Sequence, residues 1–503
     1  MKTRRLLSFF FPLLLSAPCL HGAFSQKTAW DVQTGGSDLN GGGFDTSRTS
    51  PAVDRSQSAA PYLTFDGTGC TASGTNATPT VLTISGCNPA PSEADVGNVI
   101  NITGGDHFVA GRYAITAQSG STWTLDRNAT DGTAATAMTG CMGGALATVS
   151  TAVGMFAAAA GGVADMTIYV KSGTYGPYGN ISASVASSQS YNRLAGYLAT
   201  HGDAPSGADR PVIQFTTGGG GNGFSVGAST GGWIYENLIL DGNGTNTVII
   251  SASNTASLLA NTTIRNSTAN CFLSTGSVGM SRSEVTGCNG SYAISGGTGF
   301  YFYNWLHDNS NSIATVTTSG YGGTFVGNLF TNNSGGQGLR VNAPLIITNN
   351  TFYRQGKAAV YMLSSTPFFA VYNNLFACSG TYAIDSASSP VQTSYSWVDF
   401  NAYHANTNST THFLALGSHD VSLGASGTAC DTNSPFVTPV LSGAGDWTLN
   451  NIVGAGTRLR TAGFQGPVPG MTAKGYVDIG AYQHADSGQG SCPTVSMSFP
   501  FVQ

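Results

Sequence analysis

An asparagine followed two residues later by a large apolar residue recurs through the second half of the chain at a nearly constant spacing. The stretch from residue 327 to residue 376 contains the pattern three times, as NLF, NTF and NLF. Extended in both directions, with Thr or Ser in place of Asn in two units, it gives registers separated by 21 to 27 residues. Repeats of this length are typical of solenoids and propellers. The registers begin at Asn237, Thr262, Ser283, Asn304, Asn328, Asn350, Asn374 and Asn401.

The composition of each unit decides between these architectures. A unit contains a β-branched or aromatic strand, a turn rich in Gly, Ser and Asn, and a second short strand such as Ala358–Met362. It has no room for a ten-residue amphipathic helix, which excludes leucine-rich and helical repeats, and a propeller blade needs about 40–45 residues. Several short strands in so few residues predict one coil of a parallel β-helix, with coils stacked about 4.8 Å apart.

The repeated asparagines have a structural explanation in such a fold. Asn tolerates the unusual backbone conformations that occur where a strand turns a corner. Its amide can also bond to the equivalent amide one coil above and below, which produces a ladder. We therefore interpret Asn237, Asn304, Asn328, Asn350 and Asn374 as a structural column. The residue two places further on would point inward, and this apolar column is Ile239, Ile264, Val285, Leu306, Phe330, Phe352, Phe376 and Tyr403.

Composition indicates an extracellular β protein. Only 9% of the 503 residues are charged, against about 25% in typical domains. Residues 1–23 combine Lys2, Arg4 and Arg5 with a short apolar run and a small-residue end, which predicts a secretory signal peptide and not a membrane span. Nothing later in the sequence predicts a transmembrane segment. Without residues 1–23 the chain has 16 basic and 24 acidic residues, so binding of nucleic acid through a basic face is not expected.

Eight of the nine cysteines lie after residue 23, and an even number in an exported chain predicts disulfides. The sequence does not determine the pairing. Cys70 with Cys87 and Cys271 with Cys288 are the predicted pairs, because each would close a short local loop. Free buried cysteines are the alternative. No spacing of Cys and His resembles a zinc site.

The NNTF and NNLF repeats over residues 210–405 resemble the right-handed parallel β-helix proteins of the pectate-lyase-like superfamily. Further matches are an opening strand that ends in Gly-Ser-Asp-Leu-Asn-Gly (residues 36–41), a capping helix over residues 145–160 and the strand TIYVKSGTY (residues 167–175). The segment DIGAY (residues 478–482) matches the usual end of such proteins, with Gln483 in place of an acid. The resemblance implies a fold and leaves the activity open.

The chain departs from this family in its N-terminal third, where about 100 residues separate the opening strand from the capping helix. Residues 61–66, 81–85, 98–103 and 112–125 read as strands between turns. We therefore expect a cap strand at 24–45, an inserted small β module at 46–141, the β-helix at 142–485 and a tail at 486–503. Insertions of this kind are tolerated where chain ends lie close together.

Outward residues of successive coils are neighbours in a β-helix although they are more than 20 residues apart in sequence. Arg265, Glu284 and His307 fall on three consecutive coils, and Trp305 and Tyr353 are also predicted to point outward. Glu284 would be an acid/base, His307 its partner and Arg265 the holder of an acidic group, while Trp305 and Tyr353 would stack on sugars. The alternative is an exposed ion pair of Arg265 with Glu284, worth about 0–1 kcal/mol, and a solvated His307.

A second outward line at the following turn adds Asp308 and Arg354, with Arg340 nearby, as candidate substrate-binding residues. The family resemblance implies that a lyase would use a Lys or Arg base and calcium held by several carboxylates. No such carboxylate cluster is evident in the sequence, so no cofactor or metal site is assigned, and calcium is expected only if the chain is a lyase. Two carboxylates at a glycosidase separation are equally hard to assemble.

These observations predict an exported protein that binds polysaccharide or a cell-surface glycan, at the surface or released. Two classes of alternative remain. One is a polysaccharide lyase or glycoside hydrolase that acts through Arg265, Glu284 and His307. The other is a non-catalytic structural, adhesin or spike-like surface protein, which the charge-poor composition and the inserted module favour. The sequence does not determine the polysaccharide, the oligomeric state or the mode of anchoring.

Overall fold

The computed structural model describes most of the chain between residues 24 and 481. The segments outside the description are 1–23, 26, 159–165, 184–190, 217–220, 228–231, 246, 254–255, 297–298, 319–321, 364–368, 388–396, 409–410, 412–415, 425–428, 431, 433, 441–444, 461, 465–477 and 482–503. The predicted signal peptide and tail therefore lie outside the described residues. In the part of the chain that is described, no helix has the length and apolar character needed to cross a bilayer.

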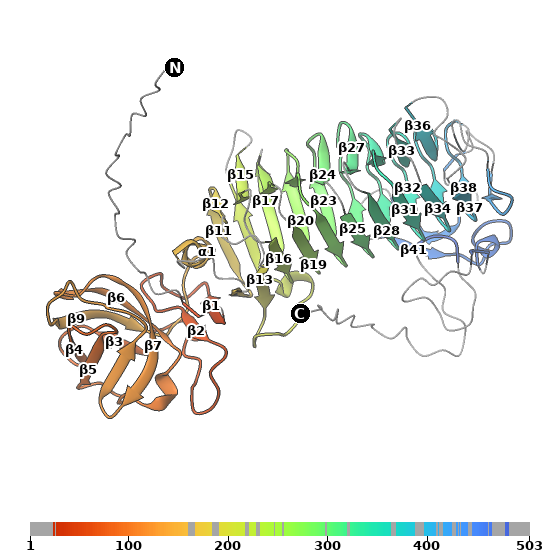
Figure 1. Ribbon diagram of the computed structural model, residues 1–503. Helices are drawn as coiled ribbons and strands as arrows, with labels where there is room; N and C mark the ends of the chain where they lie inside the picture. Colours follow the sequence, from red (N-terminus) through yellow and green to blue (C-terminus); the bar gives the residue numbers. More distant parts are fainter. Residues whose placement is uncertain are drawn as a thin grey trace, which may run out of the picture.

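Three long parallel sheets run side by side along the molecule and form a solenoid, as Figure 1 shows. Each coil contributes one short strand to each sheet, so that neighbouring strands in a sheet come from successive coils. The predicted all-β parallel β-helix is therefore confirmed. The right-handed sense and the capping role of the helix remain predictions.

The 12-stranded sheet has β2 antiparallel at its edge and all other pairs parallel. In spatial order its strands are β2 (Gly43–Asp45), β1 (Thr28–Val32), β10 (Thr167–Lys171), β13 (Tyr191–Tyr197), β16 (Gly232–Glu236), β19 (Ser257–Ala260), β22 (Val278–Ser281), β25 (Gly299–Phe302), β28 (Gly323–Val326), β31 (Leu345–Thr348), β34 (Phe369–Tyr372) and β37 (Trp397–Asp399).

The other two sheets of the solenoid are entirely parallel. The 11-stranded sheet consists of β11 (Thr174–Tyr178), β14 (Val212–Phe215), β17 (Ile239–Thr245), β20 (Thr263–Ser267), β23 (Glu284–Cys288), β26 (Trp305–His307), β29 (Leu329–Thr331), β32 (Thr351–Tyr353), β35 (Leu375–Ala377), β38 (Ala402–His404) and β39 (Val421–Ser422). The 9-stranded sheet consists of β12 (Ile181–Ser182), β15 (Asn222–Val226), β18 (Val248–Ala252), β21 (Phe272–Ser274), β24 (Tyr292–Gly296), β27 (Ala314–Thr318), β30 (Gln337–Val341), β33 (Val360–Met362) and β36 (Ile384–Ser386).

A ladder of buried asparagines runs along the corner before the 11-stranded sheet. The Oδ1 atom of Asn328 accepts bonds from the backbone N–H and the amide of Asn304, at 3.0 and 2.9 Å. The same pair of bonds links Asn328 to Asn350, Asn350 to Asn374, and Asn374 to Asn401. Each amide thus satisfies a backbone group that the corner would otherwise leave unpaired.

Asn237 does not belong to this ladder, and its assignment to the column is wrong by one residue. The strand register aligns Ile239 with Thr263, so that Leu238 takes the place equivalent to Thr262. Asn237 occupies the preceding corner position, where its φ is 57°, and its Oδ1 accepts a bond from Asn261. The left-handed corner residue is therefore the one before the ladder asparagine, as at Asn349 and Asn373.

The inward column forms a continuous stack in the later coils. The ring centroids of Phe330, Phe352, Phe376 and Tyr403 are separated by 4.6, 5.2 and 5.6 Å, and the successive rings are nearly parallel. In the first coil the inward residue is Leu240 and not Ile239, which follows from the same register shift. These side chains belong to one apolar core that extends along the solenoid.

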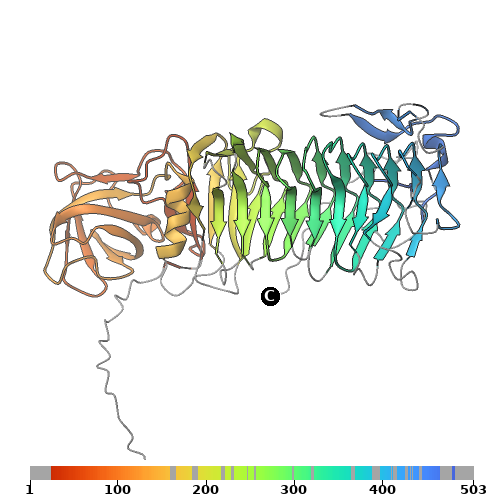
Figure 2. The same ribbon diagram turned by 90° about the horizontal axis from the view of Figure 1, so that it is seen from above.

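A second unit lies between β2 and α1 in the chain. It is a seven-stranded antiparallel sheet around its own apolar core, which contains Trp123, Leu125 and Met142. Figure 2 shows it beside the first coils, next to α1 (Val149–Ala158), whose Val149 and Val153 are buried in the solenoid core. In spatial order its strands are β3 (Leu63–Phe65), β9 (Thr136–Met142), β6 (Val99–Asp106), β7 (Gly111–Ser119), β8 (Thr122–Leu125), β5 (Val81–Ser85) and β4 (Thr71–Gly74).

The two predicted disulfides, Cys70–Cys87 and Cys271–Cys288, are confirmed. A third disulfide joins Cys378 to Cys430, 52 residues apart, and was not predicted because it is not local. Among the described cysteines, Cys141 is free.

The third disulfide lies where the chain returns over the solenoid. The described residues from 423 to 481, including the hairpin β40 (Phe436–Thr438) and β41 (Asp446–Leu449), pack on the outer face of the last coils of the 11-stranded sheet. The buried contacts join Trp447 and Phe436 to Tyr353 and Leu375. We call the described residues of this segment the C-terminal cover.

Candidate functional site

His307 lies on the outer face of the 11-stranded sheet with each ring nitrogen directed at a carboxylate. Its Nε2 lies 2.9 Å from an oxygen of Glu284, one coil earlier, and its Nδ1 lies 2.8 Å from Asp308 Oδ2. Both contacts are hydrogen bonds when both ring nitrogens carry protons. The His307 side chain is only 7% exposed, whereas those of Glu284 and Asp308 are 31% and 28% exposed. Two partly exposed carboxylates therefore flank one buried imidazole.

Glu284 is held from its other side by a residue that sequence reasoning missed. The Thr263 hydroxyl donates to Glu284 Oε2 at 2.8 Å, and Arg210 Nη2 donates to Thr263 Oγ1 at 2.8 Å. Arg210 follows the short η2 turn (Gly207–Asp209), outside the repeat pattern, so no periodicity identifies it. The result is a continuous chain of hydrogen bonds from a guanidinium through a hydroxyl and a carboxylate to an imidazole.

The ionisation of Glu284 follows from these partners. The hydrogen bond with His307 holds the pKa of Glu284 below its ordinary value, with further contributions from Thr263 and the charge of Arg210, while burial acts in the opposite direction. Glu284 is therefore an anion at neutral pH. A glycosidase general acid needs a raised pKa instead, so this geometry does not suit Glu284 to that role.

Trp305 provides an aromatic surface beside this pair. Its ring stacks on the His307 imidazole with a centroid separation of 3.6 Å, and its indole N–H donates to the Thr331 hydroxyl. The side chain is partly exposed and borders the C-terminal cover.

Arg265 does not contact Glu284 as the alternative interpretation expected. Its Nε lies 2.8 Å from Asp241 Oδ2, one coil earlier, and Asp241 also accepts bonds from the Asn266 amide. Asp241 aligns with Arg265 in the register of the parallel sheet. Arg265 thus lies on the same face as Glu284 with its own carboxylate partner.

Exposure along the outer face of the 11-stranded sheet changes abruptly from coil to coil. The outward residues before this part of the sheet are at most 5% exposed; they are Ile239, Asp241 and Thr263. All the outward residues from Leu329 to His404 are also at most 5% exposed. Between these two buried stretches, four outward residues are partly exposed. We call them the open window; they are Arg265, Glu284, Thr286 and Trp305.

Three other predicted residues lie away from the open window. Tyr353 is outward but only 1% exposed, because Trp447 and Phe436 of the C-terminal cover pack edge-on against its ring. Its prediction as an exposed stacking platform is therefore wrong. Arg354 is at the adjacent corner, with its Nε 3.0 Å from the Tyr353 hydroxyl. Arg340 is on β30 in the 9-stranded sheet, a different face, where it approaches Tyr292.

The carboxylates near the open window do not form a calcium cage. Calcium binds six to eight oxygens, yet Asp241 is paired with Arg265, and Glu284 and Asp308 with His307. Among the described residues, no group of three or more His, Cys, Asp or Glu side chains lies close enough to hold a metal ion. The donor set does not fit the calcium that a lyase of the resembled family would use.

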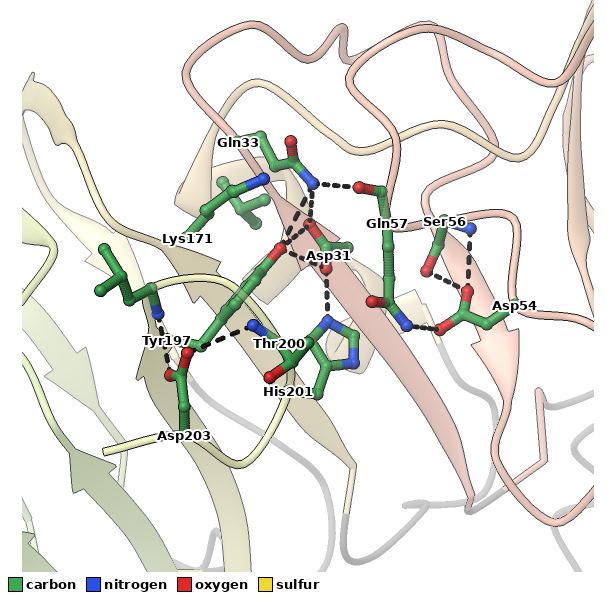
Figure 3. Close-up of polar contacts among 12 residues, drawn as sticks. Asp31, Gln33, Asp54, Ser56, Gln57, Lys171, Tyr197, Thr200, His201 and Asp203 are labelled. Atoms are coloured by element: carbon green, nitrogen blue, oxygen red, sulfur yellow. Dashed lines mark hydrogen bonds and ion pairs between the residues drawn. The ribbon is translucent and has the colours of Figure 1, made fainter. Parts of the chain in front are cut away.

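A second polar cluster, also missed by sequence reasoning, joins the first coils to the inserted module (Figure 3). The Asp31 carboxylate, which is fully buried, accepts bonds from the Tyr197 hydroxyl and Gln33, and lies 2.6 Å from His201 Nε2. Gln33 also donates to the backbone oxygen of Gln57 in the module. Burial and the adjacent Asp31 charge raise the pKa of Tyr197. Because the Asp31 carboxylate is occupied by these partners, we interpret the cluster as an anchor.

Comparisons with known proteins found solved structures of low similarity and no sequence relative. No protein-family model and no curated protein sequence matches the chain. Among solved structures, the A-module of mannuronan C-5 epimerase AlgE6 from Azotobacter vinelandii is 16% identical, with 54% of this chain and 94% of that chain covered and a TM-score of 0.28. ORF18 of Geobacillus virus E2 is 13% identical, with 52% and 53% covered and a TM-score of 0.26. The catalytic domain of a GH87 α-1,3-glucanase, solved with tetrasaccharides, is 10% identical, with 71% and 88% covered and a TM-score of 0.17. At these identities and TM-scores, none of the three assigns an activity to this chain.

Proposed function

We propose that the protein is exported and binds a polysaccharide at the open window. The observation that carries this proposal is the hydrogen-bonded pair of Glu284 and His307 with the Trp305 ring stacked beside it, on the part of the outer face that neither neighbouring segment buries. An aromatic surface next to a few fixed polar groups is the usual composition of a site that recognises a small, hydroxylated ligand.

Each residue would have a definite part in sugar recognition. The apolar face of a pyranose ring would pack on the exposed side of Trp305. The Glu284 carboxylate would accept bonds from sugar hydroxyls, and its low pKa keeps it in the accepting form at neutral pH. Arg265, which is partly exposed beside its Asp241 partner, would contact an acidic group on the polymer if one is present.

Export is supported by two features of the chain. Residues 1–23 have the composition of a secretory signal peptide. Three disulfides, including one that holds the C-terminal cover to the solenoid, are typical of proteins in oxidising compartments. We also propose that the chain belongs to the pectate-lyase-like superfamily and that its coils are right-handed.

Cleavage of the polymer is the second candidate, and elimination suits the geometry better than hydrolysis. In an elimination, a base removes the proton next to a uronate carboxyl, a carbon–carbon double bond forms, and the glycosidic carbon–oxygen bond breaks so that the leaving oxygen takes a proton. The Glu284 anion could accept the first proton, and His307 lies within reach as a partner. Because both His307 nitrogens already face carboxylates, binding without cleavage remains the leading function.

The test is a screen of the purified mature protein against uronate and neutral polysaccharides. Binding, the absorbance of unsaturated products and the formation of reducing ends would be followed with and without calcium. Retained binding with no product would establish the binding protein. Product formation that is abolished in both Glu284→Gln and His307→Ala would establish the enzyme. Failure of every polymer to bind would refute the proposal.

A further inference from the structure

The open window is closed at both ends along the axis of the solenoid. On the N-terminal side, Arg210 and the loop before it reach the sheet, where Arg210 bonds to Thr263 and to the backbone oxygen of Asn261. Pro205 of the same loop accepts a bond from the Asn261 amide. On the C-terminal side, Leu329 and the outward residues beyond it are buried, and the C-terminal cover packs on Leu329, Tyr353, Leu375, Ala377 and Ala402. In Figure 2 the loop and β40–β41 stand on the same side of the solenoid, one at each end of the intervening coils.

The distance between these two barriers follows from the register. Thr263, Glu284, Trp305 and Leu329 are consecutive partners in the parallel sheet. Three interstrand steps of about 4.8 Å place the barriers roughly 14 Å apart. A single glycan chain fits across such a gap, but a chain lying along the axis would collide with Arg210 at one end and with the C-terminal cover at the other.

The perpendicular direction remains open and leads to a pocket. Strand β23 turns at Gly287, which has a φ of 63°, and beyond this corner lies a pocket of about 450 Å³. Its lining is rich in amide and hydroxyl groups, including Asn266, Thr268 and Asn289. These residues lie at the ends of β20 and β23, the two strands that carry Arg265 and Glu284. A ligand that crosses the sheet parallel to its strands along β23 therefore passes over Glu284 and Thr286 into this pocket, with Trp305 beside it on the next coil.

From this arrangement we infer that the glycan crosses the solenoid along the strand direction, between the two barriers, and ends in the corner pocket. The inference rests on the proposed function and specifies its ligand as a short glycan segment. The crossing is limited by the width of the sheet, because the two outward-facing positions of a strand, such as Glu284 and Thr286, are about 7 Å apart. Together with the pocket, this length accommodates roughly three or four sugar units.

Two measurements test the direction of the bound chain. The first is affinity against oligosaccharide length for a polymer that binds, from two to ten units. The second compares Thr268→Trp, which fills the corner pocket, with Gln214→Trp, which places the same bulk on the outer face of β14 beyond the Arg210 barrier. Both residues are at least partly exposed, and no described side-chain contact of Thr268 is lost. Far-UV circular dichroism and the thermal midpoint show that each variant is folded.

The crossing path predicts that affinity stops increasing at about four units, that Thr268→Trp weakens binding by at least about tenfold, and that Gln214→Trp stays within about twofold of the wild type. Affinity that rises through eight or ten units, or a loss confined to Gln214→Trp, would overturn the crossing path while leaving polysaccharide binding intact. Absence of binding by any oligosaccharide or polymer would refute the proposed function and the path together.

Discussion

Asn350→Ala is the sharpest perturbation of the scaffold that supports the open window. Asn350 is fully buried, and its Oδ1 is the acceptor for the backbone N–H of Asn328 at 2.8 Å. Its amide donates to Asn374 and to the backbone oxygen of Phe325. Removal of this amide leaves the Asn328 N–H buried without its partner and opens a cavity at the corner. An unsatisfied buried group together with a small cavity costs about 2–4 kcal/mol.

The effect should be local, because the stability of a solenoid is approximately a sum of repeat and interface contributions. Hydrogen–deuterium exchange of the peptides covering residues 323–353 is therefore the appropriate assay. A loss of about 2–4 kcal/mol corresponds to exchange that is roughly 30- to 1,000-fold faster where exchange reports local opening. The module strands β6 and β7 should keep their protection, since they have a separate core.

The matched control is Asn408→Ala, because Asn408 is exposed and, within the described part of the chain, its bond to the solenoid is made by its backbone N–H. This variant should stay within about 0.5 kcal/mol of the wild type. If Asn350→Ala exchanged no faster than Asn408→Ala, the ladder would contribute nothing to stability. The structural interpretation of the asparagines would then be wrong.

Three further predictions concern the open window and its surroundings. Because the pKa of Glu284 is lowered in the folded state, its ionised carboxylate stabilises the protein at pH values above the ordinary glutamate pKa, and this stability is lost as the pH falls through the lowered pKa. In a plot of the thermal midpoint against pH, Glu284→Gln should therefore show a smaller decrease on the acid side. An unchanged decrease would contradict the assignment. Replacing both Cys378 and Cys430 by Ala removes a link across 52 residues worth about 4 kcal/mol, so limited proteolysis should release the C-terminal cover first, whereas cleavage at wild-type rates would show that packing alone holds it. Tyr353→Ala should lower the free energy of unfolding of the C-terminal cover by about 3–5 kcal/mol in denaturant titration and leave glycan affinity unchanged. Loss of affinity in a folded variant would show that Tyr353 contacts the glycan.

The parts of the fold that sequence could predict are those that repeat. The spacing of the asparagines and aromatic residues specifies a coil length, and the coil length places Glu284 beside His307 across 23 residues. The first coil shows where this reasoning fails. Asn237 and the ladder residue Asn350 look alike in sequence, because asparagine is favoured both at the left-handed corner and in the ladder one position later, as at Asn349 and Asn350.

The remaining errors come from contacts that have no period. Tyr353 occupies an outward position, and the C-terminal cover buries it by returning over the last coils. Arg210 reaches Thr263 from a loop outside the repeat, and the Asp31 cluster joins segments that are more than 160 residues apart. A second buried column at the other corner, in which Asn309 bonds to Asn333 and Asn333 to Gln355, does repeat and could have been identified from the amide five residues after the register starts at 304, 328, 350 and 401.

The central claim is that the open window, and no other face, binds the glycan. It is tested most directly by titration calorimetry of one bound oligosaccharide with the wild type, Trp305→Ala and Ile346→Ala, the last removing an exposed apolar side chain from the outer face of β31 in the 12-stranded sheet. We predict that Trp305→Ala loses about 1–3 kcal/mol of binding free energy, as stacked aromatic anchors do, while Ile346→Ala binds like the wild type. Full affinity in Trp305→Ala, or a loss in Ile346→Ala of equal size, would place the ligand elsewhere and contradict the account.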